Sequence, residues 1–364
     1  MAHSKFVALL LIAGSAIAAE NSSHGPEARL YDGNQIVAEI LSYDSHLGDG
    51  LYGNVEEITL RDSKGQITKA AMKLFNMEET KERRQSAIHN LSLLKPVFEQ
   101  DHHGVLSHSS SGLKLVPTGA RRSKRSVDVI ISPLVNGSVY SKSEMLALKP
   151  KTPDFEARLD VLLKYKRQVL EGMSLLASNG LTHGDVKPVN VLYALQAGFD
   201  WKNPDPSKIR FMLSDYDTVT PIGKSFSDFG WKYAPPELLL NHTDLASPAS
   251  DLFSHALSVY QLALGKPSWE HQADREKLYA NPKLYEEHLK ALDHSFALLE
   301  EQAPSESSRR KIKELRDFVS NGLKHSPTER LKAFPAIWAS HLKYAHASAP
   351  CENLAERVEA LLRH

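Results

Sequence analysis

A polar loop between two apolar runs carries the clearest chemistry in this sequence. Residues 181–192 read Leu-Thr-His-Gly-Asp-Val-Lys-Pro-Val-Asn-Val-Leu, which places Asp185 and Asn190 five residues apart. A carboxylate can orient an attacking hydroxyl and accept its proton, and an amide oxygen can ligate a metal ion bound to phosphates. Taken alone, the run would equally suit a solvated loop around a satisfied histidine.

Further polar and glycine-rich residues extend this chemistry along the chain. Asp215 follows an apolar run and is a second candidate oxygen ligand for a divalent cation. Upstream, residues 48–55 read Gly-Asp-Gly-Leu-Tyr-Gly-Asn-Val, and glycines let backbone N–H groups approach phosphates closely. Lys73 ends the strand-like run Ala-Ala-Met-Lys. Either feature alone is a weak signal, because a hairpin turn and a surface lysine are common; their order along the chain is what indicates phosphate chemistry.

These motifs, in this order, resemble the eukaryotic protein kinase superfamily. The loop around Asp185 is similar to its catalytic loop, and residues 48–55 are similar to its glycine-rich loop. Ser214-Asp215-Tyr216-Asp217 stands where the family has its Asp-Phe-Gly segment. The resemblance extends over residues 36–345 and implies an ATP-dependent transfer of the γ-phosphoryl group.

The resemblance also implies a role for each matching residue. Asp185 would be the catalytic base, Lys187 would contact the γ-phosphate, and Asn190 and Asp215 would hold the Mg²⁺ or Mn²⁺ that accompanies ATP. The implied ATP-binding residues are Gly48, Gly50, Gly53, Val55, Ala71, Lys73, Ile131 and Leu192. The expected partner of Lys73 is Glu82 on the following helix, with Glu78 and Glu79 as open alternatives.

Residues outside the nucleotide site would support the catalytic loop. His183 is the structural histidine of that loop in the family pattern. Glu237, at the end of Tyr-Ala-Pro-Pro-Glu, would be buried and would need a cation, which the resemblance places at Arg330. Breaking such a buried pair is strongly destabilising. Asp251, at the start of a long helix, would accept hydrogen bonds from the backbone of the catalytic loop.

Single positions bear on the substrate and on regulation. Lys187, two residues after Asp185, is the marker of Ser/Thr kinases, so we expect transfer to Ser or Thr of a protein. Gly184 replaces the Arg that holds a phosphorylated activation loop, so we expect activity not to depend on such phosphorylation. Gly230 stands where many Ser/Thr kinases have Thr. Asp217 replaces the Gly of Asp-Phe-Gly, and Gly permits backbone conformations that Asp adopts less easily.

Two other functions remain open from the sequence. His-Gly-Asp, with Asn five residues on, also occurs in small-molecule kinases of the aminoglycoside and choline type. Those enzymes lack the pairing of Glu237 with Arg330 and the helix start at Asp251. Asp217 also leaves open a pseudokinase, a module that binds nucleotide or partner proteins without catalysis. Phosphate transfer to protein, to a small molecule or to neither separates the three.

Composition limits the partners of the chain. Its 364 residues contain 44 Lys and Arg and 44 Asp and Glu, so the formal net charge is zero. A neutral chain has no general attraction to nucleic acid or to an anionic membrane. Cys351 is the one cysteine, so an internal disulfide is impossible. We expect a monomer that has no membrane span and acts on a protein substrate.

Hydrophobic periodicity divides the chain into a β-rich and a helical part. Alternation predicts strands over 36–75 and 104–135, around an amphipathic helix at 77–97. Helical periodicity predicts helices at 157–178, 250–264, 283–302 and 307–323. This pattern predicts an α+β fold, and the resemblance implies a bilobal protein kinase fold with a β-rich N-lobe (36–135) and an α-helical C-lobe (136–345). Residues 20–35 are expected to be a linker, and 346–364 a helical tail.

The N-terminal residues have the pattern of a secretory signal peptide. His3 and Lys5 precede an apolar run from Phe6 to Ala13, and small residues follow as far as Ala19. The run is shorter than a membrane-spanning helix requires. Residues 1–19 therefore predict a protein that is secreted or that resides in the lumen of the secretory pathway.

Overall fold

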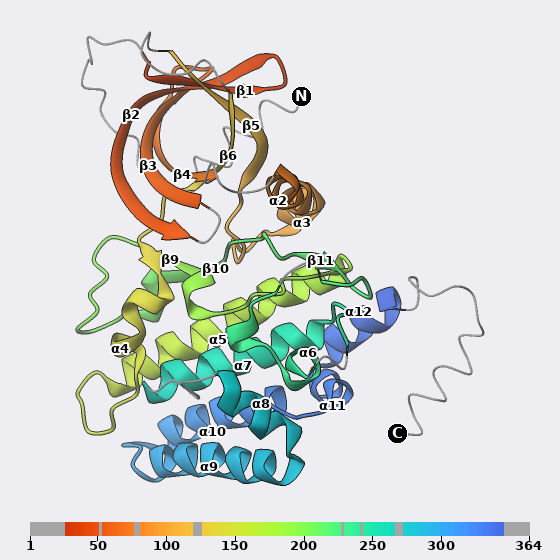
Figure 1. The fold of residues 1–364 in the computed structure, drawn as a ribbon. Coiled ribbons are helices and arrows are strands. Elements are labelled where there is room, and N and C mark those ends of the chain that lie inside the picture. Colours follow the sequence, from red (N-terminus) through yellow and green to blue (C-terminus); the bar gives the residue numbers. More distant parts are fainter. Residues whose placement is uncertain are drawn as a thin grey trace. The chain divides into compact units, whose positions relative to one another are not determined.

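The computed structural model describes residues 26–50, 53–75, 81–118, 126–226, 229–240, 243–265 and 272–345. Within them the chain forms two compact units, whose elements are labelled in Figure 1. The first unit contains the residues up to Glu99 together with Leu106–Asn136, and the second contains Gln100–Val105 and the residues from Gly137 on. The expected signal peptide (1–19) and helical tail (346–364) lie outside the described residues.

Strands dominate the first unit. Its elements are β1 (Ala28–Asp32), β2 (Gln35–Gly50), β3 (Gly53–Asp62), β4 (Ile67–Phe75), α2 (Lys81–Leu93), α3 (Lys95–Gln100), β5 (Ser110–Pro117) and β6 (Val127–Pro133). The strands close into a barrel in the order β1-β2-β3-β4-β6-β5, and each neighbouring pair is antiparallel. The alternation that predicted strands is thus confirmed in this unit.

Side chains at alternate positions fill the barrel. Ile58 and Leu60 on β3, Met72 on β4, and Val129 and Ile131 on β6 are almost completely buried in one apolar cluster. Successive side chains of a strand point to opposite faces, so the residues between them, Lys73 among them, face away from this core. The core therefore fixes which side chains are available for function.

The expected linker over residues 20–35 is wrong where the structure describes it. Residues 28–32 form β1, which pairs with both β2 and β5 and closes the barrel. Ala28 and Leu30 are buried in the apolar cluster, while the residues between them are partly exposed. This alternation spans only a few residues, and the neighbouring polar residues mask it in the sequence.

Helices dominate the second unit, which also contains short strands. The helices are α4 (Ser143–Leu146), α5 (Phe155–Ser178), α6 (Pro236–Leu239), α7 (Pro248–Leu264), α8 (Gln272–Ala280), α9 (Pro282–Glu301), α10 (Glu306–Gly322), α11 (Pro327–Lys332) and α12 (Pro335–Ala345). The 3-10 turns are η1 (Val139–Lys142), η2 (Pro188–Asn190), η3 (Pro206–Lys208) and η4 (Trp231–Tyr233). The strands are β7 (Gly137–Ser138), β8 (Leu181–Thr182), β9 (Val191–Leu195), β10 (Ile209–Leu213) and β11 (Thr220–Pro221).

The central helix of this unit is α7, and its ends follow from local chemistry. The hydroxyl of Ser247 accepts a hydrogen bond from the backbone N–H of Ala249, and Pro248 occupies the first turn. Gly265 ends the helix in the left-handed conformation, with φ of 64°. Most of α7 is buried, and it packs beside α5 and α10 (Figure 1). The predicted helices at 157–178, 250–264, 283–302 and 307–323 are confirmed within two residues at each end.

Two small sheets hold the loop that carries Asp185. β8 pairs with β11 just before the loop, and β9 pairs with β10 and β7 just after it. The loop is therefore fixed at both ends by strand pairs in the same unit. The α+β architecture expected from the sequence is confirmed. Among the described helices, none has the length and apolar character needed to cross a membrane.

Candidate active site

Asp251, in the first turn of α7, anchors the loop between β8 and β9. Its two carboxylate oxygens accept hydrogen bonds from the backbone N–H groups of His183 (2.7 Å) and Gly184 (2.8 Å). The side chain is buried, and burial raises the pKa of Asp251 to about 6. The backbone contact expected from the sequence is present, so a rigid helix positions the loop.

Asp185 lies at the centre of the loop and receives two hydrogen bonds on one oxygen. Its Oδ2 accepts from Nζ of Lys187 (2.6 Å) and from Nδ2 of Asn190 (2.9 Å). Burial raises the pKa of Asp185 to about 6, against the opposing effect of the Lys187 ammonium. The structure thus brings three of the predicted residues together around one carboxylate.

The other oxygen of Asp185 is in contact with Gly230. Oδ1 is buried and has no hydrogen-bond partner. A Cβ atom built on Gly230 would lie 1.6 Å from Oδ1, so a side chain at position 230 is incompatible with this arrangement. The N–H of Gly230 donates to the carbonyl of Gly184 (3.0 Å), which holds the two backbone segments together. In this structure Gly230 therefore covers the oxygen that carries no hydrogen bond.

His183 is buried and neutral, and it connects the loop to the Asp215 segment. Its Nε2–H donates to the carbonyl of Ser214 (3.0 Å), while Nδ1 accepts from the N–H of Asp185 (3.3 Å). Burial lowers the pKa of His183 to about 4, which agrees with a neutral ring that donates at one nitrogen and accepts at the other. Its ring lies against that of Tyr216, with centroids 5.6 Å apart. The histidine therefore has a structural role, as expected.

Ser214, which directly precedes Asp215, connects the Asp215 segment to Asn190. The N–H and the hydroxyl of Ser214 both donate to the carbonyl of Asn190, each at 2.9 Å. Asp215 follows directly and has a positive φ of 63°, which is uncommon for a residue other than glycine. Asp215 is therefore next in sequence to a residue that is hydrogen-bonded twice to the backbone of Asn190.

The oxygen atoms of this pair suit Mg²⁺. Within the described residues, no three His, Cys, Asp or Glu side chains gather as a metal cluster. Mg²⁺ in phosphoryl transfer needs few protein ligands, because phosphates and water complete its octahedron. Asn190 donates to Asp185 with Nδ2, so its Oδ1 is the atom with the chemistry of a hard ligand. One carboxylate and one amide oxygen are a fitting donor set.

The departures at Asp217 and Gly184 are accommodated by the fold. Among the described non-glycine residues, only Lys151 and Asp215 have positive φ, so the backbone at Asp217 does not require glycine. Gly184 has φ of 81°, and a Cβ there would lie 2.9 Å from the carbonyl oxygen of Thr218. Thr218 also donates its hydroxyl to the carbonyl of His183 (2.8 Å). Gly184 is therefore required by the way this segment crosses the loop.

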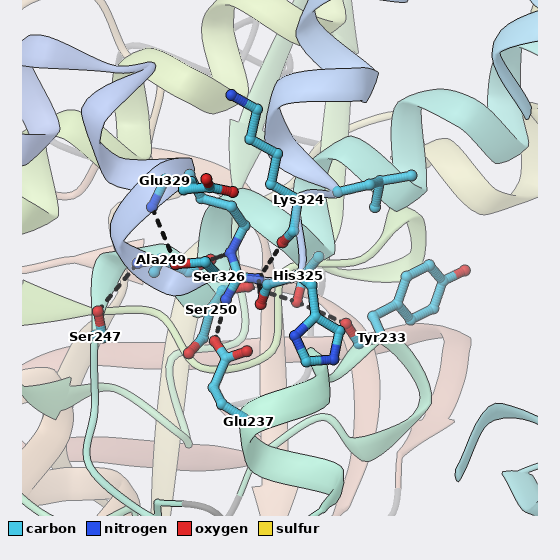
Figure 2. Close-up of polar contacts among 12 residues, drawn as sticks. Tyr233, Glu237, Ser247, Ala249, Ser250, Lys324, His325, Ser326 and Glu329 are labelled. Atoms are coloured by element: carbon cyan, nitrogen blue, oxygen red, sulfur yellow. Dashed lines mark hydrogen bonds and ion pairs between the residues drawn. The ribbon is translucent and has the colours of Figure 1, made fainter. Parts of the chain in front are cut away.

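Glu237 of α6 and Arg330 of α11 form a buried ion pair. Arg330 is completely buried, and its guanidinium also donates to the carbonyls of Ala249, Lys324 and His325. In Figure 2 the side chain of Glu237 extends from α6 toward this group, between the start of α7 and the segment before α11. Its carboxylate accepts from the same guanidinium as the three carbonyls. The predicted pair is present, and it ties the end of the segment after Asp215 to two helices.

On the first unit, Lys73, Val55 and Ala71 share the barrel face opposite the core. Val55 is the cross-strand partner of Lys73, and Ala71 is two residues from Lys73 on β4. Cross-strand partners and residues two apart point to the same side of a sheet. Gly48, Gly50 and Gly53 lie on the adjoining ends of β2 and β3. The predicted nucleotide residues of this unit thus gather on one surface, with one exception.

That exception is Ile131, whose prediction as an ATP contact is wrong. Ile131 is 2% exposed inside the barrel, where it pairs with Met72. Ser132 is the residue of β6 on the functional face, because its cross-strand partner is Ala71. Sequence reasoning chose the larger apolar residue, whereas the strand register selects its neighbour.

The predicted roles of Leu192 and Glu82 are neither confirmed nor contradicted by the structure. Leu192 lies on β9, where it is partly buried and pairs with Met212 and Ser138. Glu82 falls in the first turn of α2, but its side chain lies outside the described residues, as do Glu78 and Glu79. The role of Glu82 stays a prediction.

The comparison with known families identifies the class of protein. A family model described as a protein kinase domain matches residues 41–341. The chain therefore belongs to the protein kinase family. The catalytic loop held by Asp251 and the buried pair of Glu237 and Arg330 agree with this family rather than with the small-molecule kinases.

Individual relatives are protein kinases of low identity. Protein kinase gsk3 of Schizosaccharomyces pombe is 23% identical over 319 residues, which cover 84% of this chain and 75% of that protein. Cyclin-dependent kinase C-3 of Oryza sativa subsp. japonica is 24% identical over 313 residues, or 81% of this chain and 89% of that protein. Serine/threonine-protein kinase PDK1 of Cryptococcus neoformans var. grubii is 29% identical over 111 residues, only 9% of its length. This chain is accordingly an enzyme of the protein Ser/Thr kinase class.

Proposed function

We propose that this protein transfers the γ-phosphoryl group of ATP to Ser or Thr hydroxyls of a protein, with Asp185 as the catalytic base. The observation that carries the proposal is the arrangement of Lys187 and Asn190 on one oxygen of the Asp185 carboxylate. A base held in this way can orient a hydroxyl and accept its proton as the bond to phosphorus forms.

The neighbouring residues supply charge and orientation. The Lys187 ammonium, already beside Asp185, is suited to the developing charge of the γ-phosphate. Asn190 and Asp215 would hold Mg²⁺, which when bound neutralises charge on the β- and γ-phosphates. Lys73, Val55, Ala71 and Ser132 form the surface of the first unit that we assign to the nucleotide.

Part of the segment after Asp215, residues 223–226, is held by backbone hydrogen bonds to residues 244–246. The N–H of Gly223 donates to the carbonyl of Ala246 (2.9 Å), that of Ala246 to the carbonyl of Lys224 (2.7 Å), and that of Phe226 to the carbonyl of Asp244 (2.8 Å). This ribbon holds the segment without a phosphate. We therefore propose that the active state does not depend on phosphorylation of the segment, in agreement with the glycine at position 184.

A second candidate function is a nucleotide-binding scaffold without catalysis. The contact of Gly230 with Oδ1 of Asp185 favours it, because a hydroxyl reaches that oxygen only after the carboxylate turns or the chain at Gly230 shifts. The hydrogen bonds on Oδ2 favour the enzyme.

We also propose that the protein acts in or beyond the secretory pathway. The motif over residues 1–19 carries this part of the proposal. A fusion of residues 1–25 to a reporter should direct the reporter into the lumen and be cleaved near Ala18 or Ala19. Retention of an uncleaved, cytosolic reporter would contradict it.

The enzymatic proposal is tested with purified protein, a mixture of unmodified proteins, radiolabelled ATP and Mg²⁺. Wild type should label protein, and Asp185→Ala should lose at least about a hundredfold of that rate. Both proteins should be stabilised against heat by ATP with Mg²⁺, because Asp185 contacts the acceptor rather than the nucleotide. If ATP with Mg²⁺ stabilises the wild-type protein but wild type labels no protein, the enzymatic proposal is contradicted and the nucleotide-binding scaffold is supported.

A further inference from the structure

Tyr344, in the last turn of α12, lies against the turn that leads from α5 into the loop of Asp185. Its hydroxyl donates a hydrogen bond to the carbonyl of Ser178 (2.9 Å), the last residue of α5. A Cβ atom built on Gly180 would lie 2.8 Å from Cδ1 and 3.0 Å from Cε1 of the Tyr344 ring. The ring is therefore in contact with the backbone of Gly180, where a side chain has no room.

Gly180 connects this contact to the strands that lead into the loop. Its φ of 76° lies in the left-handed region that favours glycine, which turns the chain from the end of α5 into β8. Its carbonyl accepts a hydrogen bond from the N–H of Ile222 (2.9 Å), directly after β11. β8 and β11 pair with each other, and Thr182 donates its hydroxyl to the carbonyl of Thr220 (3.0 Å). A displacement of Gly180 would therefore move this pair of strands.

The loop is thus held from two sides. Asp251 of α7 accepts hydrogen bonds from the N–H groups of His183 and Gly184, which fixes the loop itself. Tyr344 of α12 fixes the turn just before β8, where the chain enters the loop. Phosphoryl transfer depends on the exact orientation of the attacking hydroxyl, and a small displacement of the base lowers the rate strongly. The contact from α12 is therefore placed to affect the rate of transfer.

We propose that Tyr344 is a positioning residue for Asp185, because its ring, packed on Gly180, fixes the entry of the chain into the catalytic loop. The proposal rests on the function proposed above. A flat ring can cover the bare backbone of a glycine, and the hydroxyl satisfies a carbonyl at the end of α5 that has no partner within that helix. Tyr344 lies beyond residues 41–341, which the family model matches, so the matched family pattern does not include this contact.

The test measures kcat and both KM values of the full chain, with one protein from the labelled mixture as substrate. Rates are divided by the amount of folded enzyme, taken from the stoichiometry of ATP binding. Tyr344→Ala should lower kcat about tenfold, while the KM for ATP and for the protein change less than about twofold. Tyr344→Phe keeps the ring and should keep at least about half of kcat. Ile337→Ala, at a residue of α12 that is 2% exposed, should lower thermal stability and leave kcat unchanged.

Two glycines test the same contact from the other side, and they decide the question even if Tyr344→Ala does not fold. Gly180→Ala should lower kcat about tenfold, because the new methyl group must displace the ring or the turn. Gly198→Ala is the matched control, since its φ of 77° gives alanine the same backbone strain. The nearest atom there is the flexible end of Lys208, at 3.3 Å, so kcat should not change.

The outcomes separate the positioning role from the proposed function. An unchanged kcat in Tyr344→Ala or in Gly180→Ala overturns the positioning role alone. So does a decrease of kcat in Ile337→Ala as large as that in Tyr344→Ala, or equal decreases in Gly180→Ala and Gly198→Ala, because packing or backbone strain would then explain the loss. If wild type labels no protein, the proposed function is overturned as well.

Discussion

Gly230 occupies a position at which a side chain would collide with the carboxylate of Asp185. The separation of 1.6 Å between a Cβ at 230 and Oδ1 is far shorter than any contact between unbonded atoms. Where many related kinases have threonine, this chain has a backbone that lies directly on the base. The loop around Asp185 and the backbone around Gly230 are therefore positioned by each other.

The first prediction concerns this contact. Gly230→Ala should lower kcat by about ten- to a hundredfold, because the new methyl group must displace either the base or the segment that covers it. The KM for ATP should change little. Peptide phosphorylation under saturating ATP measures the effect.

Gly322→Ala is the control for a general loss of packing. A Cβ at position 322 would lie 2.4 Å from Cβ of Ala256, so it would disturb the packing of α10 against α7. Both residues are far from Asp185 in the sequence. It should lower thermal stability while kcat per folded molecule is kept. Equal kcat values for Gly230→Ala and wild type would show that the contact does not govern the base.

The second prediction concerns the buried ion pair. Arg330→Met should destabilise the protein by about 3–5 kcal/mol, because Glu237 and several carbonyls lose their shared partner in a buried environment. Urea unfolding measures the change. Arg309→Ala removes an exposed pair with Glu306 and should cost less than about 1 kcal/mol. Similar decreases in the free energy of unfolding for Arg330→Met and Arg309→Ala would show that burial does not make the Glu237–Arg330 pair more important for stability than an exposed pair.

The third prediction separates two neighbours on β6. Ser132→Phe should raise the KM for ATP at least about tenfold, because a large ring would fill the face that Ala71 and Lys73 share. Ile131→Val should leave that KM unchanged and cost about 0.5–1.5 kcal/mol of stability, since Ile131 belongs to the barrel core. A raised KM for ATP in Ile131→Val together with an unchanged KM in Ser132→Phe would contradict this prediction and would favour Ile131 as the nucleotide contact.

The fourth prediction concerns acid stability. Burial lowers the pKa of His255 to about 3, from an ordinary value of 6.5, and its Nε2 donates to the carbonyl of Lys166. Below pH 6.5, His255 is protonated in the unfolded chain but stays neutral in the native state. The free energy of unfolding therefore falls as the pH drops below 6.5. Between pH 7 and pH 5 this one residue should account for about 2 kcal/mol.

His255→Gln removes the titrating ring but keeps a donor for Lys166. Its free energy of unfolding, from urea titrations at the two pH values, should decrease by about 2 kcal/mol less than that of wild type. The same decrease in both proteins would mean that His255 is not buried as a neutral ring. His183 is also buried and neutral, so some dependence on pH should remain.

Much of the fold and of the site could be predicted from the sequence. The helix around Asp251 and the loop around Asp185 are local in sequence, and their types and spacing are chemically specific. The pairing of Glu237 with Arg330 was predicted because the family resemblance places a cation opposite a buried carboxylate. These expectations required no register or packing detail.

Other features depend on packing that a sequence does not display. The register of β6 decides between Ile131 and Ser132, and one position changes the face. β1 owes its place to barrel closure, which involves pairs far apart in the chain. The contact of Gly230 with Asp185 joins segments that lie far apart in the sequence. The glycine at 230 is visible in the sequence as a departure from the family pattern, and its reason is the contact with Asp185.

The central claim is that the phosphoryl group reaches Ser or Thr of a polypeptide through Asp185. Its most direct test is phosphoamino-acid analysis of proteins labelled from radioactive ATP, with wild type and Asp185→Asn compared at equal occupancy by ATP and Mg²⁺. The account predicts phosphoserine and phosphothreonine with wild type and at most about a hundredth of that label with Asp185→Asn. Equal labelling by the two proteins, label confined to small molecules, or no label despite bound nucleotide would contradict it.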